Sequence, residues 1–306
     1  MHAGLVGRML IESLAGIPVT VDLASEYRYA PPVTVGHTLA VPVSQSGETS
    51  DTLQALRLAR KNGLSSLGVI NVVGSAIARE SDAVMYTGAG PEIAVATTKG
   101  YASQVTVLAM LAVKLGYLRG RIGAERASEL CHSLADVLPA NIAEIISRRP
   151  EIAELAKKIY SHDDLFYIGR GPDCAAAPEC SLKLKEISYI HSEAYAAGEL
   201  KHGTLSLVTE GTPVIALATD PKYYDKMTGN IREVKSRSGY VILVAAPDFP
   251  SPDEYADDVF VLPAVDPMLS PLESAVFSQL LAYEAALLRG CDVDHPRNLA
   301  KSVTVE

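Results

Sequence analysis

Cysteine is scarce in this sequence, and its few copies form no pattern. The 306 residues include four cysteines, Cys131, Cys174, Cys180 and Cys291, at irregular spacings. A chain of this length needs no disulfides to stabilise its core, so a disulfide framework is not expected. The sequence also lacks Cys-x-x-Cys, and its seven histidines never form His-x-x-x-His. A bound metal is therefore not expected.

Positive charge and long apolar runs are also in short supply. Lys and Arg total 27 against 36 Asp and Glu, a net charge of −9, which disfavours nucleic acid and anionic membranes as partners. The longest apolar stretch, 105–113, is too short to cross a bilayer. The opening MHAGLVGRMLIESLAG lacks the basic and apolar segments of a secretory signal. We expect a cytoplasmic protein with no membrane partner.

Short apolar runs alternate with longer helical patterns throughout the chain. This alternation is typical of parallel sheets built from βαβ units, so we expect a doubly wound, flavodoxin-like α/β sandwich of three layers, its mostly parallel sheets flanked by helices. The expected strands are 38–43, 67–71, 83–87, 165–168, 213–218, 240–244 and 258–262. The expected helices are 4–14, 49–62, 97–115, 125–146, 174–188, 225–237 and 273–288.

The two halves of the chain repeat one order of elements. TLAVPV in the first half parallels TPVIALA in the second, and SDAVMYTGAGPE parallels DDVFVLPAVDP. We interpret this order as a tandem duplication, with domains at 1–130 and 131–290 and a C-terminal tail at 291–306. The second half opens with a strand and turn, DLFYIGRGPD, that has no counterpart in the first. The first domain is therefore expected to lack its N-terminal strand.

A hydroxyl-rich turn, SQSGET at 44–49, follows the first expected strand and opens a helix. Free N–H groups and the helix dipole favour an anion there, and the hydroxyls add donors. The turn has no lysine, so it is not a Walker loop, and it suits a sugar phosphate better than a nucleoside triphosphate. The alternative is that these residues only cap the helix. A second cluster, VATTK at 95–99, has the same two interpretations.

The segment KLKEISYIHSEAYAAGELKH gathers titratable side chains. Lys183 and Glu186 share a helical face, where a carboxylate beside a cation can move a proton next to a carbonyl; the alternative is a surface ion pair of little worth. A histidine changes charge near neutral pH, so His202 can move the proton that opens a sugar ring. The alternative is a loop histidine with no catalytic role. Lys301 in the tail is either an amine that forms a Schiff base or part of a solvated terminus.

Four stretches together resemble one family. SQSGETSDTLQALRLAR, EIAVATTK, LKLKEISYIHSEAYAAGELKHG and DVDHPRNLAKSVTVE are similar, in this order, to glucosamine-6-phosphate synthases, also called glutamine–fructose-6-phosphate aminotransferases (isomerizing). The resemblance covers essentially the whole chain but only the isomerase half of the family, a pair of tandem sugar-isomerase (SIS) domains. It implies ketose–aldose isomerisation of fructose 6-phosphate and formation of glucosamine 6-phosphate, without a cofactor or metal, in a homodimer.

The resemblance also implies roles for individual residues. Glu186 matches the base that moves a proton between C1 and C2, and Lys183 matches its catalytic partner. His202 matches a ring-opening histidine that serves the neighbouring subunit's site, and Lys301 matches the lysine that forms a Schiff base with the open ketose. The positions that match the family's phosphate loop and sugar pocket are Ser44, Gln45, Ser46, Thr49, Val95, Thr97 and Ala300, with Thr97 standing where the family usually has Ser.

Some family features are absent from this sequence. The glutaminase domain is missing, so ammonia is expected from a glutaminase domain or chain elsewhere. Met1 falls just after the family's Cys-Gly-Thr-Ser turn, and Thr204 replaces the usual Pro after His202-Gly203. Three other interpretations stay open: a glucosamine-6-phosphate deaminase–isomerase that runs the chemistry backwards, a non-catalytic sugar-phosphate-binding SIS module, and a gene fragment.

Overall fold

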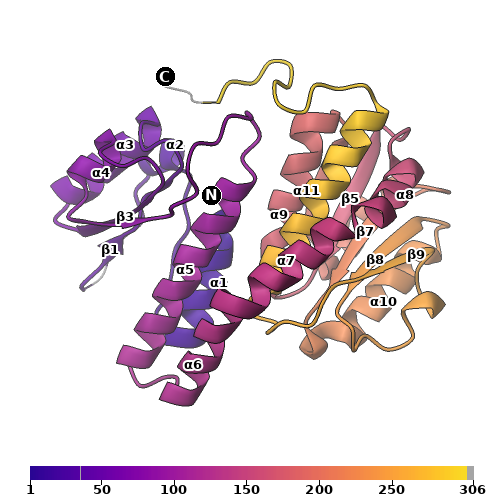
Figure 1. The fold of residues 1–306 in the computed structure, drawn as a ribbon, viewed down its shortest axis with the longest axis horizontal. Helices are drawn as coiled ribbons and strands as arrows, with labels where there is room; N and C mark the ends of the chain where they lie inside the picture. Colours follow the sequence, from indigo (N-terminus) through magenta and orange to yellow (C-terminus); the bar gives the residue numbers. More distant parts are fainter. Residues whose placement is uncertain (35, 302–306) are drawn as a thin grey trace. The chain divides into compact units, whose positions relative to one another are not determined.

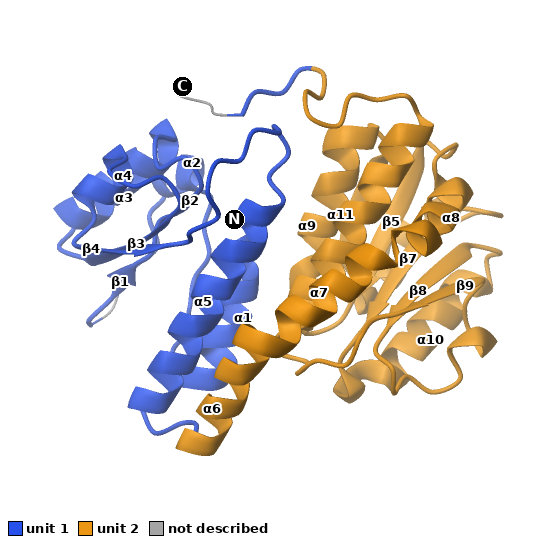
Figure 2. Ribbon diagram, viewed as in Figure 1, with its two compact units in different colours: residues 1, 3–123, 298–306 blue, residues 2, 124–297 orange. Residues whose placement is uncertain are grey.

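The computed structural model describes residues 1–34 and 36–301. The chain folds into two compact units, which Figure 2 colours separately. Unit 1 comprises Met1, Ala3–Gly123 and the chain from Asn298 onward, and unit 2 comprises His2 and Ala124–Arg297. The described tail residues 298–301 therefore belong to a different unit from residues 291–297.

Unit 2 contains a parallel sheet of five strands in the order β6-β5-β7-β8-β9. The central strands read PVIALA and YVILVA, and nearly all of these residues are buried. Continuous apolar runs of this kind are expected where helices cover both faces of a sheet. The strands are β5 (Asp164–Gly169), β6 (His191–Ala196), β7 (Pro213–Ala218), β8 (Tyr240–Ala245) and β9 (Asp258–Val261).

Helices cover both faces of this sheet (Figure 1). The helices of unit 2 are α6 (Ala124–His132), the π-helical turn η1 (Ser133–Val137), α7 (Leu138–Ser147), α8 (Arg149–Ile159), α9 (Pro172–Ser188), α10 (Tyr224–Lys235) and α11 (Ser270–Leu288), with short 3₁₀ segments η2 (Ala197–His202), η3 (Thr204–Leu207), η4 (Pro221–Tyr223) and η5 (Pro252–Glu254). On one face, Ile231 of α10 packs in a cluster with Ile168 and Leu243. On the other face, the ring of Phe277 in α11 lies 4.8 Å from that of Phe260 in β9.

Unit 1 contains a smaller parallel sheet centred on β3. β4 pairs with one edge of β3, while β1 and β2 pair with the other in one continuous register, Leu39 opposite Ser65 and Val43 opposite Val69. They are two parts of one strand, interrupted where Pro42 has no N–H to donate. The bounds are β1 (Leu39–Ala40), β2 (Val43–Ser44), β3 (Ser65–Ile70) and β4 (Ala83–Tyr86).

The helices of unit 1 are α1 (His2–Ala15), α2 (Ala24–Tyr27), α3 (Ser50–Lys61), α4 (Ala76–Glu80) and α5 (Lys99–Leu118). α1 and α5 pack closely, and glycines stand at their contacts. A Cβ at Gly7 would lie 2.9 Å from Leu108, and one at Gly116 would lie 2.6 Å from the carbonyl oxygen of Leu14, so neither position has room for a side chain. By length and composition alone, α5 is the one described helix that is apolar enough to cross a membrane. Its packing against α1 makes it a core helix of this fold.

The predicted class, a doubly wound α/β fold with parallel strands, is confirmed. Each expected strand and helix is present within a few residues of its expected bounds, the long helix 125–146 being divided by the π-helical turn. The strand β6 and the helices α2, α4 and α8 were not predicted. β6 (HSEAYA) is a polar edge strand, and α8 begins with Pro150 in its first turn, where proline is tolerated. The buried Ile152, Leu155 and Ile159 of α8 already stand at helical spacing in the sequence.

The two units differ before their first long helix. In unit 2, β5 precedes α9, and β6 pairs with β5. In the described part of unit 1, α1 has no strand before it, and residues 17–22, which follow α1 as β6 follows α9, form no strand.

Phe277→Ala tests the core of unit 2. The Phe277 side chain is completely buried, so its removal leaves a cavity, and we expect the free energy of unfolding to fall by about 3–5 kcal/mol. Urea titration followed by circular dichroism measures this change. Leu288→Ala on the same helix is the control, because Leu288 is 42% exposed and the loss should stay below about 1 kcal/mol. Equal losses for the two variants would contradict the assigned packing.

Glu273 makes stability depend on pH. Its side chain is buried in α11, and burial raises its pKa from 4.5 to about 7, although Asn141 Nδ2 donates a hydrogen bond to Oε1 at 2.7 Å. Between these two pKa values the unfolded chain loses a proton that the folded chain keeps, so stability falls as pH rises. Glu273→Gln keeps a neutral group there. We expect the melting temperature of the wild type to fall relative to this variant between pH 5 and 7.5; parallel curves would refute the assignment.

Candidate functional site

The 44–49 turn of unit 1 joins β2 to α3 at the carboxyl end of the sheet. Ser44 is buried and its Oγ accepts the N–H of Gly47 at 2.9 Å, while Ser46 Oγ accepts the N–H of Glu48 at 3.2 Å. Thr49 stands at the N-cap position of α3, but its side chain makes no capping hydrogen bond to a described residue. The hydroxyls thus shape the turn itself, and the helix start remains available to an anion.

Gly47 is required by the shape of this turn. Its φ is +67°, and a Cβ there would lie 2.0 Å from Ser75 Oγ. The Gly47 carbonyl accepts the N–H of Ile77 at 3.0 Å, and Glu48 Oε1 accepts the N–H of Ala76 at 2.8 Å. The turn is therefore fixed against the start of α4.

A cavity of about 430 Å³ opens beside the turn within unit 1. Its volume is in the range of small-molecule sites. Gln45 of the turn and Lys301 of the tail both line it, which brings two of the predicted site residues together. The full lining is Gln45, Asn71, Val72, Gly90, Pro91, Glu92 and Lys301.

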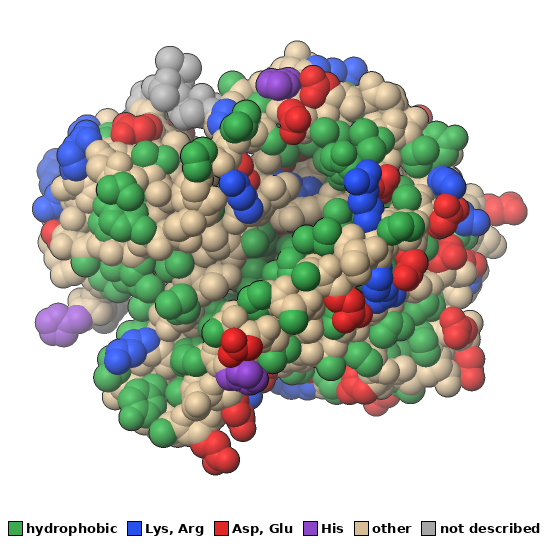
Figure 3. All heavy atoms as spheres, in the orientation of Figure 1, with side chains coloured by type: hydrophobic (Ala, Val, Ile, Leu, Met, Phe, Trp, Pro, Cys, Tyr) green, Lys and Arg blue, Asp and Glu red, His purple; other side chains and the backbone are tan. Residues whose placement is uncertain are grey.

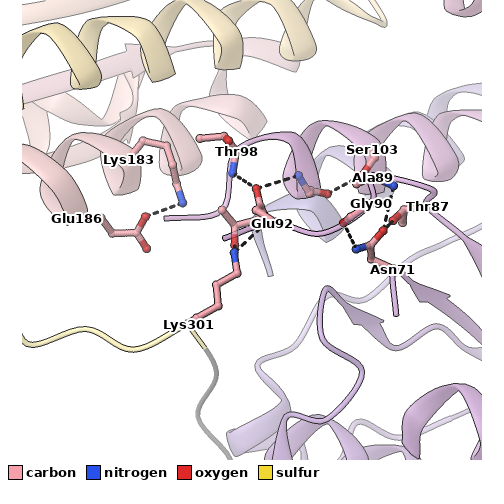
Figure 4. Close-up of polar contacts among 12 residues, drawn as sticks. Asn71, Thr87, Ala89, Gly90, Glu92, Thr98, Ser103, Lys183, Glu186 and Lys301 are labelled. Carbon is pink, nitrogen blue, oxygen red and sulfur yellow. Dashed lines mark hydrogen bonds and ion pairs between the residues drawn. The ribbon is translucent and has the colours of Figure 1, made fainter. Parts of the chain in front are cut away.

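Lys301 is held inside unit 1 by a carboxylate. Its Nζ lies 3.1 Å from Glu92 Oε2 and 3.5 Å from Thr97 Oγ1 (Figure 4). Thr97 and Val95 are half-buried, whereas Ala300 is exposed on the tail. The structure thus places Lys301 beside a predicted pocket residue, Thr97.

Lys183 and Glu186 lie on one face of α9 in unit 2, as their spacing predicts. Lys183 Nζ is 2.6 Å from Glu186 Oε2 and 3.3 Å from Glu179 Oε1. The side chains of Lys183 and Glu179 are 4% and 6% exposed, and that of Glu186 is 22% exposed. The surface-pair interpretation is wrong, because the cation is buried between two carboxylates and only Glu186 remains accessible.

His202 is the last residue of η2 in unit 2, and it is exposed. Gly203, with φ +149°, follows it, and Thr204 begins η3. An exposed imidazole at the end of a short segment is available to another molecule.

The start of the tail is anchored in unit 2. The Arg297 guanidinium lies 4.2 Å from the centroid of the Tyr189 ring, and the Arg297 N–H donates to Tyr189 Oη at 2.8 Å. Tyr189 is the left-handed C-cap of α9, three residues after Glu186. Sequence reasoning missed this anchor, since a stacked Arg and Tyr so far apart in the chain leave no local pattern.

The matching end of the unit 2 sheet is filled by its own side chains. Asp173, in the first turn of α9, accepts the N–H of Thr219 at 2.8 Å and its hydroxyl at 2.7 Å. Burial raises the pKa of Asp173 to about 6. A Cβ at Gly171 would lie 2.3 Å from the ring of Tyr223, so this ring covers the loop between β5 and α9. A carboxylate thus bonds to Thr219, the residue directly after β7, the strand that matches 38–43 of unit 1.

Glu92, Asn71 and Glu179 are further site residues that were not predicted from the sequence. Glu92 stands directly before the IAVATTK segment, but its partners come from the start of α5 and the end of the tail. Glu179 precedes Lys183 by one helical turn, a spacing that was available in the sequence. On the face in Figure 3, cationic and anionic side chains are interspersed, unlike the continuous basic surface of nucleic-acid binders.

A model of the SIS domain family matches residues 1–114 and 158–289. Over 305 residues the chain is 55% identical to glutamine–fructose-6-phosphate aminotransferase (isomerizing) of Symbiobacterium thermophilum and 49% identical to that of Thermus thermophilus. Each match covers 100% of this chain and 50% of the relative, so the chain spans about half the length of these curated relatives.

Solved structures show the same similarity. The C-terminal domain of glucosamine-fructose-6-phosphate aminotransferase from Francisella tularensis matches with a TM-score of 0.91 and 35% identity, over 96% of this chain and 84% of that chain. A glucosamine-6-phosphate deaminase from Thermotoga maritima matches with a TM-score of 0.79 over 99% and 86% of the two chains; at 24% identity it shows the fold alone. The predicted resemblance is confirmed.

Gly47→Ala tests the anion-binding role of the 44–49 turn. The clash with Ser75 should displace the turn and weaken binding of a phosphate monoester at least tenfold in isothermal titration calorimetry. Gly74→Ala is the matched control, because Gly74 also has a positive φ, +71°, but an added Cβ there would meet open space. The affinity of the Gly74→Ala protein for the phosphate monoester should stay within twofold of the wild-type value. Unchanged affinity in a folded Gly47→Ala protein would remove the turn from the site.

Proposed function

Because this chain belongs to the SIS-domain family, we propose that it carries the isomerase activity of a glucosamine-6-phosphate synthase. The substrate is fructose 6-phosphate, and the product is glucosamine 6-phosphate when ammonia is supplied and glucose 6-phosphate when it is not. The observation that carries the proposal is the cavity of unit 1, where the Lys301 amine and Gln45 of the hydroxyl-rich turn line one space.

The sugar is bound at both ends of that cavity. Ser44, Ser46 and Thr49, with Gln45 and the start of α3, bind the phosphate, since hydroxyls and helix N–H groups are good donors to an anion. Val95, Thr97 and Ala300 lie along the carbon chain of the sugar. We assign no second phosphate to unit 2, because the Asp173 carboxylate bonds to the N–H and hydroxyl of Thr219 directly after β7.

The amine of Lys301 reacts with the open ketose. Its nitrogen attacks the C2 carbonyl, a C–N bond forms and water leaves, which gives an imine at C2 without a separate cofactor. Ammonia then replaces the lysine nitrogen and releases Lys301. The resulting fructosimine carries the nitrogen that remains in the product.

Glu186 moves the proton that turns the ketose imine into an aldose amine. Its carboxylate takes a proton from C1 and returns it to C2, while the O1 proton passes to the nitrogen. The buried Lys183 ammonium lies 2.6 Å from Glu186 Oε2 and holds this carboxylate in position.

The covalent chain supports a joint action of Glu186 and Lys301. Arg297, anchored on Tyr189, precedes Lys301 by four residues, and a chain of that length spans at most about 14 Å. Tyr189 itself follows Glu186 by three residues in the sequence. The tail thus connects the Lys301 amine to the helix that carries Glu186 through a short stretch of chain.

The proposal includes partners. An exposed His202 suits ring opening in the site of a second copy of this chain, so the active form is a homodimer that works in the cytoplasm. Ammonia comes from a glutaminase domain or chain, since this chain matches only half the length of the synthases.

Glu186→Gln tests the chemistry. The purified chain is incubated with fructose 6-phosphate, with and without ammonium, and glucose 6-phosphate and glucosamine 6-phosphate are assayed. We expect Glu186→Gln to lower both rates at least 100-fold, since amide cannot accept the proton. Glu144→Gln is the control: it changes an exposed carboxylate of unit 2 and should leave both rates unchanged.

A substrate-dependent mass increase on the tail after borohydride reduction, lost in Lys301→Met, would support the imine. Full activity in Glu186→Gln would refute its role as base. Binding of fructose 6-phosphate without turnover in the wild type would favour the non-catalytic module instead.

A further inference from the structure

We propose that Glu92 is a positioning residue that holds the Lys301 amine in the cavity of unit 1. The proposal rests on the proposed function, in which Lys301 is the amine that reacts. Glu92 lies on the loop between β4 and α5, and its side chain is only 4% exposed. Its Oε2 is 3.1 Å from Lys301 Nζ.

The Glu92 carboxylate is fixed from behind by α5. Its Oε1 accepts the N–H of Thr98 at 2.8 Å and that of Gly100 at 3.3 Å. These are N–H groups at the start of a 20-residue helix, where the helix dipole favours negative charge. One oxygen therefore caps the helix, and the other is left to face the lysine.

Gly100 makes room for this arrangement. A Cβ at Gly100 would lie 2.7 Å from Glu92 Oε2. Any larger residue at this position must therefore move the oxygen that faces Lys301. The absence of a side chain at 100 and the position of the carboxylate depend on each other.

The loop that carries Glu92 is fixed by Asn71, at the carboxyl end of β3 (Figure 4). Asn71 Oδ1 accepts the Thr87 hydroxyl at 3.0 Å and the N–H of Ala89 at 2.9 Å, and its Nδ2 donates to the carbonyl of Gly90 at 2.9 Å. The rigid sheet thus orients the loop, the loop orients Glu92, and Glu92 orients Lys301.

Lys301 needs such support because it stands on a tail that lies outside the sheets and helices. Its side chain has four rotatable bonds, and an amine that must attack a carbonyl gains from being held near the reacting carbon. A fixed carboxylate supplies a direction and an opposite charge for the Lys301 side chain.

Glu92→Gln separates the two tasks of the carboxylate. The amide oxygen can still cap α5, but its NH₂ group faces the Lys301 ammonium as donor against donor. We expect kcat with fructose 6-phosphate to fall at least tenfold while KM stays within threefold, because the phosphate turn is untouched. Gly100→Ala should act in the same direction, and Glu80→Gln, which alters the partly exposed Arg57 pair of unit 1, should change nothing.

Trypsin provides a readout that needs no substrate. Cleavage after Lys301 requires its side chain to leave Glu92, so we expect Glu92→Gln to speed release of the last five residues at least fivefold, and Glu80→Gln to leave the rate unchanged. Wild-type rates of cleavage and turnover in a folded Glu92→Gln protein would overturn the inference while the proposed function stands. If the wild type has no activity, the proposed function fails, and the cleavage rates alone decide whether Glu92 holds Lys301.

Discussion

Parallel strand order is the constraint on which the rest of the structure depends. In a parallel sheet every strand ends at the same edge, so the loops that follow neighbouring strands meet there. In unit 1 the edge brings together the 44–49 turn after β2, Asn71 after β3 and the Glu92 loop after β4. None of these segments is adjacent in sequence, and the sheet is what makes them one cavity.

The two units use the same architecture in opposite ways. Unit 1 leaves the start of α3, after β2, open and lines it with hydroxyls, whereas in unit 2 the buried carboxylate of Asp173 bonds to Thr219, directly after β7. A duplicated fold needs only one ligand site, and the second copy is free to replace ligand contacts with its own hydrogen bonds. Unit 2 instead contributes a face of α9, where burial of Lys183 between Glu179 and Glu186 holds a base in position.

Burial changes the value of these charges. An exposed pair of Lys and Glu contributes little to stability, because water screens it. The same pair inside a protein has a large desolvation cost, which is offset only by close partners of opposite charge. Two carboxylates around one ammonium meet that requirement for Lys183, and the start of α5 together with Lys301 meets it for Glu92.

The sequence by itself determined the elements and several site residues. Apolar runs marked the strands, helical spacing put Lys183 and Glu186 on one face, and the SQSGET motif marked the open turn, because each of these signals is local. β6 was not predicted, because a polar edge strand is defined by the strand it pairs with and not by its own sequence pattern. The resemblance to the synthases gave roles to residues that local chemistry left with two interpretations.

Only the tertiary structure decided which charged groups meet. Glu92 and Lys301 are 209 residues apart, and Asp173 and Thr219 are 46 apart, so neither pair leaves a periodic signal. The buried state of Lys183 likewise depends on how α11 and the sheet pack around α9. The physical reason is that burial and long-range pairing are properties of the assembled fold, whereas periodicity and spacing are properties of the chain.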